Sequence, residues 1–191
     1  MMSKVSCLLF VFGLIVFSQA VSADSNRVNN PGFESGNIGG WSTWAVTDTV
    51  SSSVNHTPGG KFSASPSLNA ENGPFELGAL IQEFDDFRSG DTVCASVLVK
   101  TVGLKGAQGT DVFAILKLEF WSGDKMVSSR ESSGITGTND WHEMKVETVV
   151  PENTTKVKIT LLLWNKNGTG NVGTVYFDDV YIGNSQNPSY I

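Results

Sequence analysis

Histidine and cysteine are scarce in this chain, with two of each among 191 residues. Two histidines and two cysteines are too few to build a cluster of zinc ions, each of which takes four ligands. Charged residues are also few, at 17%, against about 25% in ordinary soluble domains. Acidic residues outnumber basic ones by 19 to 13, which argues against nucleic acid as a partner, because phosphate binding needs clustered lysine and arginine. A hydrophobic fraction of 40% excludes a disordered chain.

Long apolar runs are absent apart from the ten residues 8–17 (LLFVFGLIVF), which are too few for a membrane span of about 20. Lys4 precedes this run, and Val21-Ser22-Ala23 follows it in the pattern of a signal-peptidase site. The sequence therefore predicts a signal peptide at 1–23 and a secreted, extracellular protein without a membrane anchor. One domain is expected over 24–191, with its core at about 28–183. The alternative for the apolar run is an uncleaved anchor helix.

Loss of the signal peptide would remove Cys7 and leave Cys94 as the one cysteine. A single cysteine in an exported protein forms no internal disulfide. We expect Cys94 to be a small buried side chain on a strand, with pairing between two molecules as the alternative. Core packing, with or without a metal ion, must then stabilise the fold. We expect the protein to be a monomer.

The hydrophobic pattern has period two, and no segment keeps an apolar period of 3.6 for three turns. Each of five segments has one apolar face and one face of mixed character, and polar or glycine-containing turns separate them. The expected strands are 92–100, 111–121, 143–150, 156–164 and 174–182. Short strands at this spacing without helical intervals are typical of an all-β, antiparallel two-sheet β-sandwich or jelly roll. The apolar faces would form the core, and the mixed faces would look outward or line a cleft.

Six short motifs occur in order along the chain and resemble those of carbohydrate-binding modules of the family 4, 9 and 22 type, which are galactose-binding-like jelly rolls. They are NNPGFESG at 29–36 with Gly40-Trp41, GKFS at 60–63, IQEF at 81–84, SVLVK at 96–100, Trp141 with Val150-Pro151, and VYFDDV at 175–180. The resemblance implies a module that binds a polysaccharide or oligosaccharide without cutting it. A fold hosts many functions, so the motifs speak for the fold more than for the ligand.

The resemblance also implies a structural calcium ion that joins the first strand to the last. Carried over residue by residue, its ligands would be the Gly32 carbonyl, the Glu34 carboxylate, the Lys61 carbonyl and Asp178. Calcium takes six to eight such oxygens. Pro58 stands where many relatives have a further glutamate, so the site is expected to be weaker, to use water or to be empty. The alternative is that Glu34 is a turn carboxylate and Asp178 a surface residue.

Aromatic rings hold a sugar by its C–H faces, and polar side chains hold it by its edges. By strand parity, Trp121 and Trp164 lie on mixed faces, where a large ring is unexpected unless it binds something. Trp44 lies at a loop, another common place for a ligand platform. These three are the candidates for sugar stacking. The alternative is that they cap the ends of the sandwich, and Trp41 and Trp141 are expected in the core.

Three polar residues complete the candidate ligand site. Gln82 stands where the family motif has an amide, although its parity with neighbouring apolar residues suggests a buried amide instead. Lys100 and Glu119 lie on mixed faces, where most polar residues are simply solvated. His56 and His142 are expected on the solvated surface.

No catalytic motif is present. A glycosidase needs two carboxylates in one cleft, and the pairs Asp85-Asp86 and Asp178-Asp179 are adjacent in sequence, so their side chains should point to opposite faces. The alternative function from another class is a structural or adhesive surface protein; a polysaccharide hydrolase or lyase ranks lower. Sequons at Asn55, Asn153 and Asn167 fall in expected loops and would carry glycans only in a eukaryotic secretory pathway.

Overall fold

The computed structural model describes residues 25–56, 58–68, 76–106, 112–165 and 171–185, so the expected signal peptide and Asn167 lie outside the described residues. These residues form ten strands and no helix. The strands are β1 (Ser42–Trp44), β2 (Val50–Ser51), β3 (Ser63–Ala64), β4 (Glu76–Phe84), β5 (Thr92–Gly106), β6 (Val112–Ser122), β7 (Lys125–Glu131), β8 (Gly137–Val149), β9 (Lys156–Asn165) and β10 (Asn171–Asn184). Within the described parts of the chain, no helix is long and apolar enough to cross a membrane.

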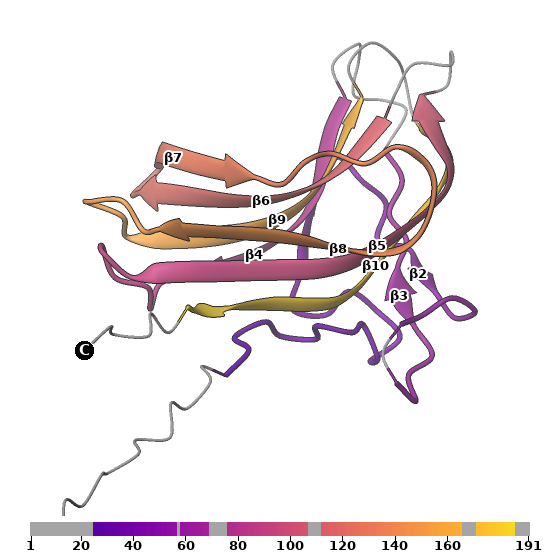
Figure 1. The fold of residues 1–191 in the computed structure, drawn as a ribbon, viewed down its shortest axis with the longest axis horizontal. Coiled ribbons are helices and arrows are strands. Elements are labelled where there is room, and N and C mark those ends of the chain that lie inside the picture. The colour runs from indigo at the N-terminus through magenta and orange to yellow at the C-terminus, as the bar shows by residue number, and fades with distance from the viewer. Residues whose placement is uncertain (1–24, 57, 69–75, 107–111, 166–170, 186–191) are drawn as a thin grey trace, which may run out of the picture.

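The strands form two five-stranded sheets whose pairings are all antiparallel. The first sheet has the order β1-β4-β9-β6-β7 and the second has β2-β3-β10-β5-β8. In Figure 1, β8, β5 and β10 cross the molecule together as one layer, and β7, β6 and β9 belong to the other. The predicted two-sheet β-sandwich is confirmed.

The core lies between the inner faces of the two sheets. Val93, Ala95, Val97 and Val99 of β5 are all fully buried, as their alternation predicts. The same holds for the apolar faces of β6 and β9, and Trp41 is buried as expected. A bulge-free register across β4, β9 and β6 keeps every second residue of these strands on the outer face. This regularity positions the candidate site.

Two expectations about buried residues were wrong. Trp141 is only half-buried; it lies within β8 and meets the His56 ring edge-on at 5.6 Å between centroids. It lies outside the core because it shares the strand parity of the exposed Glu143 and Lys145, whereas Met144 and Val146 face the interior. Cys94 is also half-buried, because its parity on β5 is opposite to that of the core valines. Partial burial raises the pKa of the Cys94 thiol.

The N-terminal segment runs beside β10, so the two ends of the domain are joined. Arg27 N donates to the Ile182 carbonyl (3.0 Å), and Val180 N donates to the Pro31 carbonyl (3.0 Å). The Asn26 side-chain amide donates to the Val180 carbonyl (2.8 Å). These hydrogen bonds form a seam between the first and last parts of the described chain.

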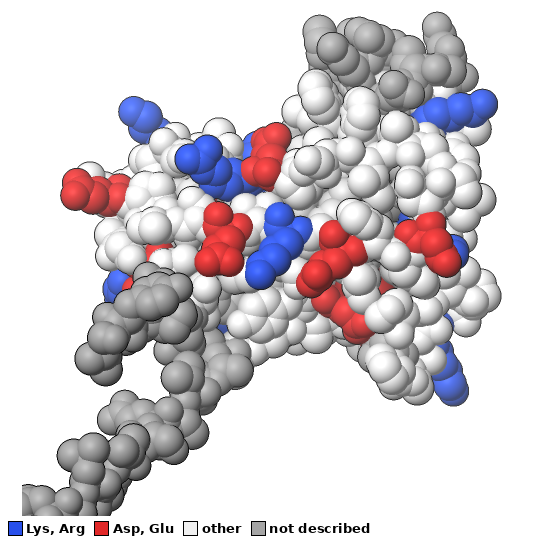
Figure 2. Space-filling model, viewed as in Figure 1, with Lys and Arg blue, Asp and Glu red and all other residues white. Residues whose placement is uncertain are grey.

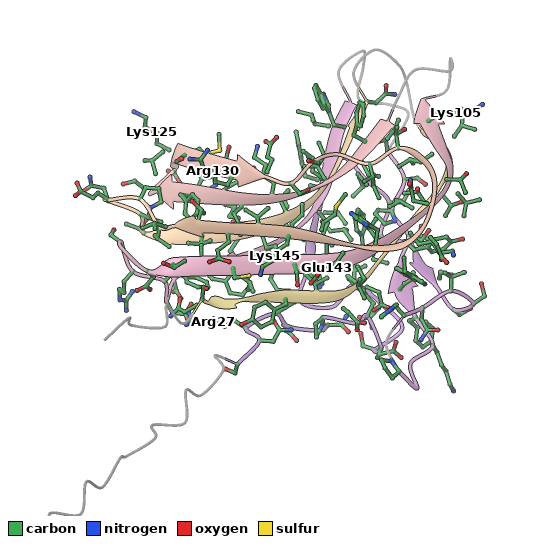
Figure 3. The ribbon with its side chains drawn as sticks, viewed as in Figure 1. Arg27, Lys105, Lys125, Arg130, Glu143 and Lys145 are labelled. Carbon is green, nitrogen blue, oxygen red and sulfur yellow. The ribbon has the colours of Figure 1, made fainter. Side chains whose placement is uncertain are left out.

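The outer face of the second sheet carries charges of both signs. Figure 2 shows acidic and basic side chains interspersed over this side of the molecule, without a large patch of one sign. Glu143 and Lys145 stand here on β8, as labelled in Figure 3. The described charges on this side of the molecule are therefore of mixed sign.

Candidate functional site

A groove of about 590 Å³ lies over the outer face of the first sheet. All five strands of that sheet contribute side chains to it. They are Trp44, Leu77, Ala79, Ile81, Ile115, Lys117, Glu119, Trp121, Met126, Glu131, Lys158, Thr160, Leu162 and Trp164. On β6 and β9 these are the mixed-face residues that alternation predicts, so the sequence correctly identified the face on which the groove is built.

The strand register arranges these side chains in rows across the sheet. One row runs Trp44, Ala79, Leu162 and Ile115 from β1 to β6. The next row toward Trp121 runs Ile81, Thr160, Lys117 and Glu131 from β4 to β7. Because each row is two residues further along the strands, successive rows are about 6.6 Å apart. The first of these rows is apolar and the second contains Thr160, Lys117 and Glu131, so the groove has an apolar end and a charged end.

The charged end of the groove consists of Lys117, Glu119, Trp121, Glu131 and Lys158. Lys117 Nζ lies 3.4 Å from Glu119 and 3.3 Å from Glu131. The Trp121 indole N–H donates to Glu119 Oε2 at 3.0 Å. Lys158 Nζ lies 4.5 Å from the centroid of the Trp121 ring, a cation–π contact. These contacts fix the Trp121 ring and leave Lys158 over one of its faces.

Glu83 anchors the charged end from outside the groove lining. It accepts from Lys156 Nζ and Lys158 Nζ, both at 2.7 Å. The hydrogen bond from Lys156, followed by that from Lys158, holds the pKa of Glu83 below its ordinary value of 4.5. The same bond raises the pKa of Lys156. Glu83 thus helps to hold Lys158 in place over Trp121.

This arrangement predicts a pH dependence on the acid side. Because the pKa of folded Glu83 is depressed, the ionised carboxylate stabilises the fold above the unfolded-state pKa near 4.5. That stabilisation is lost as the pH falls below 4.5 through the folded-state pKa. Melting temperatures of the wild type and Glu83→Gln should differ at pH 7 and converge toward pH 3. A difference that stays constant over this range would contradict the role of Glu83.

The apolar end of the groove consists of Trp44, Leu77, Ala79, Ile115, Leu162 and Trp164. Trp44 is 53% exposed and Trp164 is 37% exposed. The Trp164 ring packs beside Phe113, with 6.1 Å between ring centroids. Ala79, Ile115 and Leu162 form a small buried cluster beneath them. Two accessible indole rings thus stand on an aliphatic floor.

Four of the six predicted ligand-site residues come together in this groove: Trp44, Glu119, Trp121 and Trp164. Trp44 lies on the short edge strand β1 rather than in a loop. That these residues contact a ligand stays a prediction.

The structure does not place Gln82 and Lys100 in the groove. Gln82 is buried on the opposite face of β4, where its amide accepts from Asn29 N (2.7 Å) and donates to the Asn29 carbonyl (3.0 Å). Strand parity, not the family motif, predicted this correctly. Lys100 lies on β5 of the second sheet and pairs with Asp140 at 2.5 Å. The Lys100 hydrogen bond lowers the pKa of Asp140.

Sequence reasoning missed the residues that complete the groove from β4 and β7. Ile81 and Ala79 follow from the parity of β4, since they alternate with the buried Leu80 and Gln82. Glu131 is brought opposite Lys117 only by the register of the β6–β7 hairpin. The polar, mostly exposed sequence of β7 gives no period-two signal from which this pairing could have been predicted.

The proposed calcium ligands lie around the loop that precedes β3. The Glu34 carboxylate accepts from Lys61 N (2.8 Å) and Phe62 N (3.1 Å). Asp178 is fully buried, and its Oδ2 accepts from His56 N at 2.5 Å. Carboxylates from the first and last parts of the domain therefore bind the segment that runs from His56 to Phe62 at its two ends. Of the alternative interpretation, the part in which Glu34 is a turn carboxylate agrees with the structure, whereas Asp178 is buried and is not a surface residue.

This donor set fits a calcium ion only in part. Calcium prefers carboxylate and carbonyl oxygens together, and two carboxylates are available here. Among the described residues, no group of three or more histidine, cysteine, aspartate or glutamate side chains could hold a metal ion. Backbone carbonyl oxygens would therefore have to supply most of the coordination.

The expectation that Asp178 and Asp179 point to opposite faces was wrong. Both carboxylates reach one residue, because His56 Nδ1 lies 2.7 Å from Asp179 Oδ2 while its backbone N donates to Asp178. A register shift in β10 between Asp178 and Tyr181, with Asp179 at φ 48°, breaks the alternation. His56 and His142 lie at the surface as expected, but His56 is paired rather than simply solvated.

Comparison with protein families finds no match, and comparison with curated proteins finds none either. Among solved structures, the chain is similar to TmCBM61 in complex with β-1,4-galactotriose, with a TM-score of 0.56 and 20% identity over 84% of this chain and 99% of that one. It is also similar to the C-terminal family 22 carbohydrate-binding module of Clostridium thermocellum Xyn10B, with a TM-score of 0.59 and 14% identity over 86% and 98% of the two chains.

A third similar structure is the enzymatically active domain of bacteriophage CBA120 tailspike protein 4, with a TM-score of 0.63 and 16% identity. The match covers 84% of this chain but only 21% of the tailspike chain. Two of these three neighbours are whole carbohydrate-binding modules. The chain therefore shares the two-sheet jelly-roll fold of these carbohydrate-binding modules, as its motifs led us to expect.

Proposed function

We propose that this protein binds an oligosaccharide or polysaccharide in the groove of the first sheet and does not cleave it. The observation that carries the proposal is the placement of three tryptophans with charged hydrogen-bonding side chains in one groove. Rings of this kind cover the C–H faces of sugars, and a few placed polar groups orient the ligand. The fold shared with modules crystallised with sugars supports the same function.

The tryptophans differ in how they would take part. Trp44 and Trp164 have accessible rings, on which further rings of an oligosaccharide or an apolar group that it carries would pack. Trp121 has Lys158 over one face and its N–H bound to Glu119. A sugar would therefore meet only the other face of Trp121, next to the polar groups that bind hydroxyls.

The charges of the groove favour a neutral sugar over an acidic one. Lys117, Lys156 and Lys158 are matched by Glu83, Glu119 and Glu131, and each lysine contacts at least one of these glutamates. An anionic sugar would have to displace a carboxylate from its lysine. Neutral hydroxyls can instead bind both partners by charge-assisted hydrogen bonds.

Glu119 and Glu131 are a carboxylate pair in one groove, which sequence reasoning did not foresee. Hydrolysis needs one carboxyl group to donate a proton to the leaving group. Here Lys117 Nζ lies between the two groups and pairs with both. This geometry suits hydrogen bonding to a bound sugar better than proton donation, so we infer a binding role for both.

Titration of tryptophan fluorescence with xylohexaose, β-1,4-galactotriose, glucan, mannan and chitin fragments tests the proposal. We expect saturable binding to at least one of them, weakened in Trp121→Ala and unchanged in Trp141→Ala, whose ring lies outside the groove. Absence of any response across the panel would favour the structural or adhesive alternative. Release of reducing ends that is lost in Glu119→Gln or Glu131→Gln would show a hydrolase instead.

We further propose that calcium stabilises the seam between the chain ends through Glu34, Asp178 and the Gly32 and Lys61 carbonyls. Calcium at ten times its dissociation constant would then stabilise the fold by about 1.4 kcal/mol, or a rise in melting temperature of roughly 3–5 °C. Differential scanning fluorimetry with calcium and with EDTA measures this rise. Asp178→Asn should abolish it, and Asp124→Asn, in the turn between β6 and β7 of the first sheet, should leave it intact. If the melting temperature of the wild type were the same with calcium and with EDTA, the proposed calcium site would be wrong.

Secretion through a signal peptide at 1–23 and a monomeric state also belong to the proposal. The apolar run of residues 8–17 and the small residues before Asp24 support secretion. N-terminal sequencing of the exported protein should begin at Asp24. Light scattering should give the mass of one chain.

A further inference from the structure

The groove is sharply divided along its length. In its last two rows, all side chains over the sheet are apolar: Trp44, Ala79, Leu162 and Ile115 in one, and Leu77, Trp164 and Phe113 in the other. By contrast, the row at the charged end is polar throughout and consists of Glu83, Lys158, Glu119 and Ser129. The boundary lies in the row of Thr160 and Lys117.

A bare sugar chain does not suit both halves equally. Its rings carry hydroxyls around their edges, and a hydroxyl that leaves water needs a hydrogen-bond partner. At the charged end, lysine and glutamate side chains can supply such partners. Among the described residues that line the apolar end, the two indole N–H groups are the only polar side-chain groups, and the side chains between them are aliphatic. The apolar end is therefore better matched to hydrocarbon than to hydroxyls.

We propose that the ligand is amphipathic: a neutral sugar that lies at the charged end and carries an apolar alkyl, acyl or aryl group on the floor of Leu77, Ala79 and Leu162. This inference rests on the proposed sugar binding and adds to it the chemical class of the ligand. Trp44 and Trp164 flank the apolar group, because Trp44 stands beside Ala79 on the edge strand, Trp164 stands beside Leu77 in the outermost row, and both are accessible.

Thr160 marks the junction between the two halves. Its side chain is only 3% exposed, and its hydroxyl makes no hydrogen bond within the described part of the chain. It lies between Ile81 and Lys117 in the boundary row.

The length of the groove accommodates such a ligand. Lys158 and Trp164 are six residues apart on β9, which corresponds to about 20 Å along the strand. The charges of the first half are balanced within the protein, so the sugar need not be ionic.

Paired glycosides test the inference. Binding of methyl and hexyl β-D-glucopyranoside, galactopyranoside and xylopyranoside is measured by calorimetry below the concentration at which the hexyl compounds aggregate. We expect a hexyl glycoside to bind at least tenfold more tightly than its methyl partner, since several methylenes leave water. Leu162→Ala should reduce this ratio at least threefold, whereas Lys117→Met should weaken both members of the pair equally.

The outcomes separate this inference from the proposed function. Oligosaccharide binding with a hexyl-to-methyl ratio near one would overturn the apolar assignment alone. If hexanol displaced the hexyl glycosides completely, and all hexyl glycosides bound with equal affinity, the sugar would contribute nothing. That result would overturn the assignment of the charged end to a sugar as well. Should Leu162→Ala fail to fold, the indole N–H resonances of the wild type decide: hexyl but not methyl glycosides must shift Trp44 and Trp164, with Trp141 as the unshifted reference.

Discussion

Replacing Trp164 with alanine is expected to weaken sugar binding by roughly thirtyfold, or about 2 kcal/mol, the size typical of a tryptophan hot spot. The ring is 37% exposed, lies in the groove and is held by Phe113 at 6.1 Å. It is therefore preorganised and loses little freedom when a ligand packs on it. Isothermal titration with the best ligand of the panel measures the effect.

Two matched variants sharpen this prediction. Trp164→Phe keeps an aromatic face and should lose only part of the affinity. Trp141→Ala removes the same side chain from the second sheet, where it contacts His56, and should leave affinity unchanged. The melting temperature of Trp164→Ala should stay close to that of the wild type, because the ring is not in the core. Equal losses in the Trp141 and Trp164 variants would show that binding does not occur in the groove.

Replacing Gly78 with alanine is expected to cost about 2–3 kcal/mol of stability and to weaken binding together with it. A Cβ at this position would lie 2.7 Å from the Ala45 carbonyl oxygen and 2.5 Å from Val46 Cγ1. Overpacking of this kind forces the backbone to move. The segment that must move follows Trp44, whose strand β1 pairs with β4. Chemical denaturation and calorimetry on the same variant measure both effects.

A second substitution tests the physical cause. Val46→Ala removes one of the two closest atoms, so the double variant Gly78→Ala/Val46→Ala should recover part of the stability that Gly78→Ala loses. The carbonyl contact remains, so recovery should be incomplete. If Gly78→Ala were as stable as the wild type, β1 would not be fixed by its close approach to β4.

The strands that the sequence predicted are those with one strictly apolar face. β5, β6 and β9 supply most of the core, and burial enforces their period of two. The periodic pattern did not reveal β1, β2, β3 or β7, which have two to seven residues each, nor β4, which has nine. β1 and β7 are edge strands with solvated side chains, so no alternation marks them.

The groove was predictable only where strand parity applies. Trp121, Glu119 and Trp164 follow from the alternation of β6 and β9, because no bulge interrupts their pairing. Glu131 depends on the register between β6 and β7, and the contacts of Asp178 and Asp179 depend on a bulge in β10. These features come from pairing between distant segments, and local sequence does not specify them.

In β4, β6 and β9, positions that face the core alternate with positions that face the groove, and this alternation has a practical consequence. Leu161, Leu163 and Ile159 fill the interior, while Lys158, Thr160, Leu162 and Trp164 alternate with them on the groove side. Every second position of β4, β6 and β9 can therefore be varied in a library while the intervening positions keep the sandwich intact. A scaffold of this kind lends itself to the selection of reagents with altered glycan or glycoconjugate specificity.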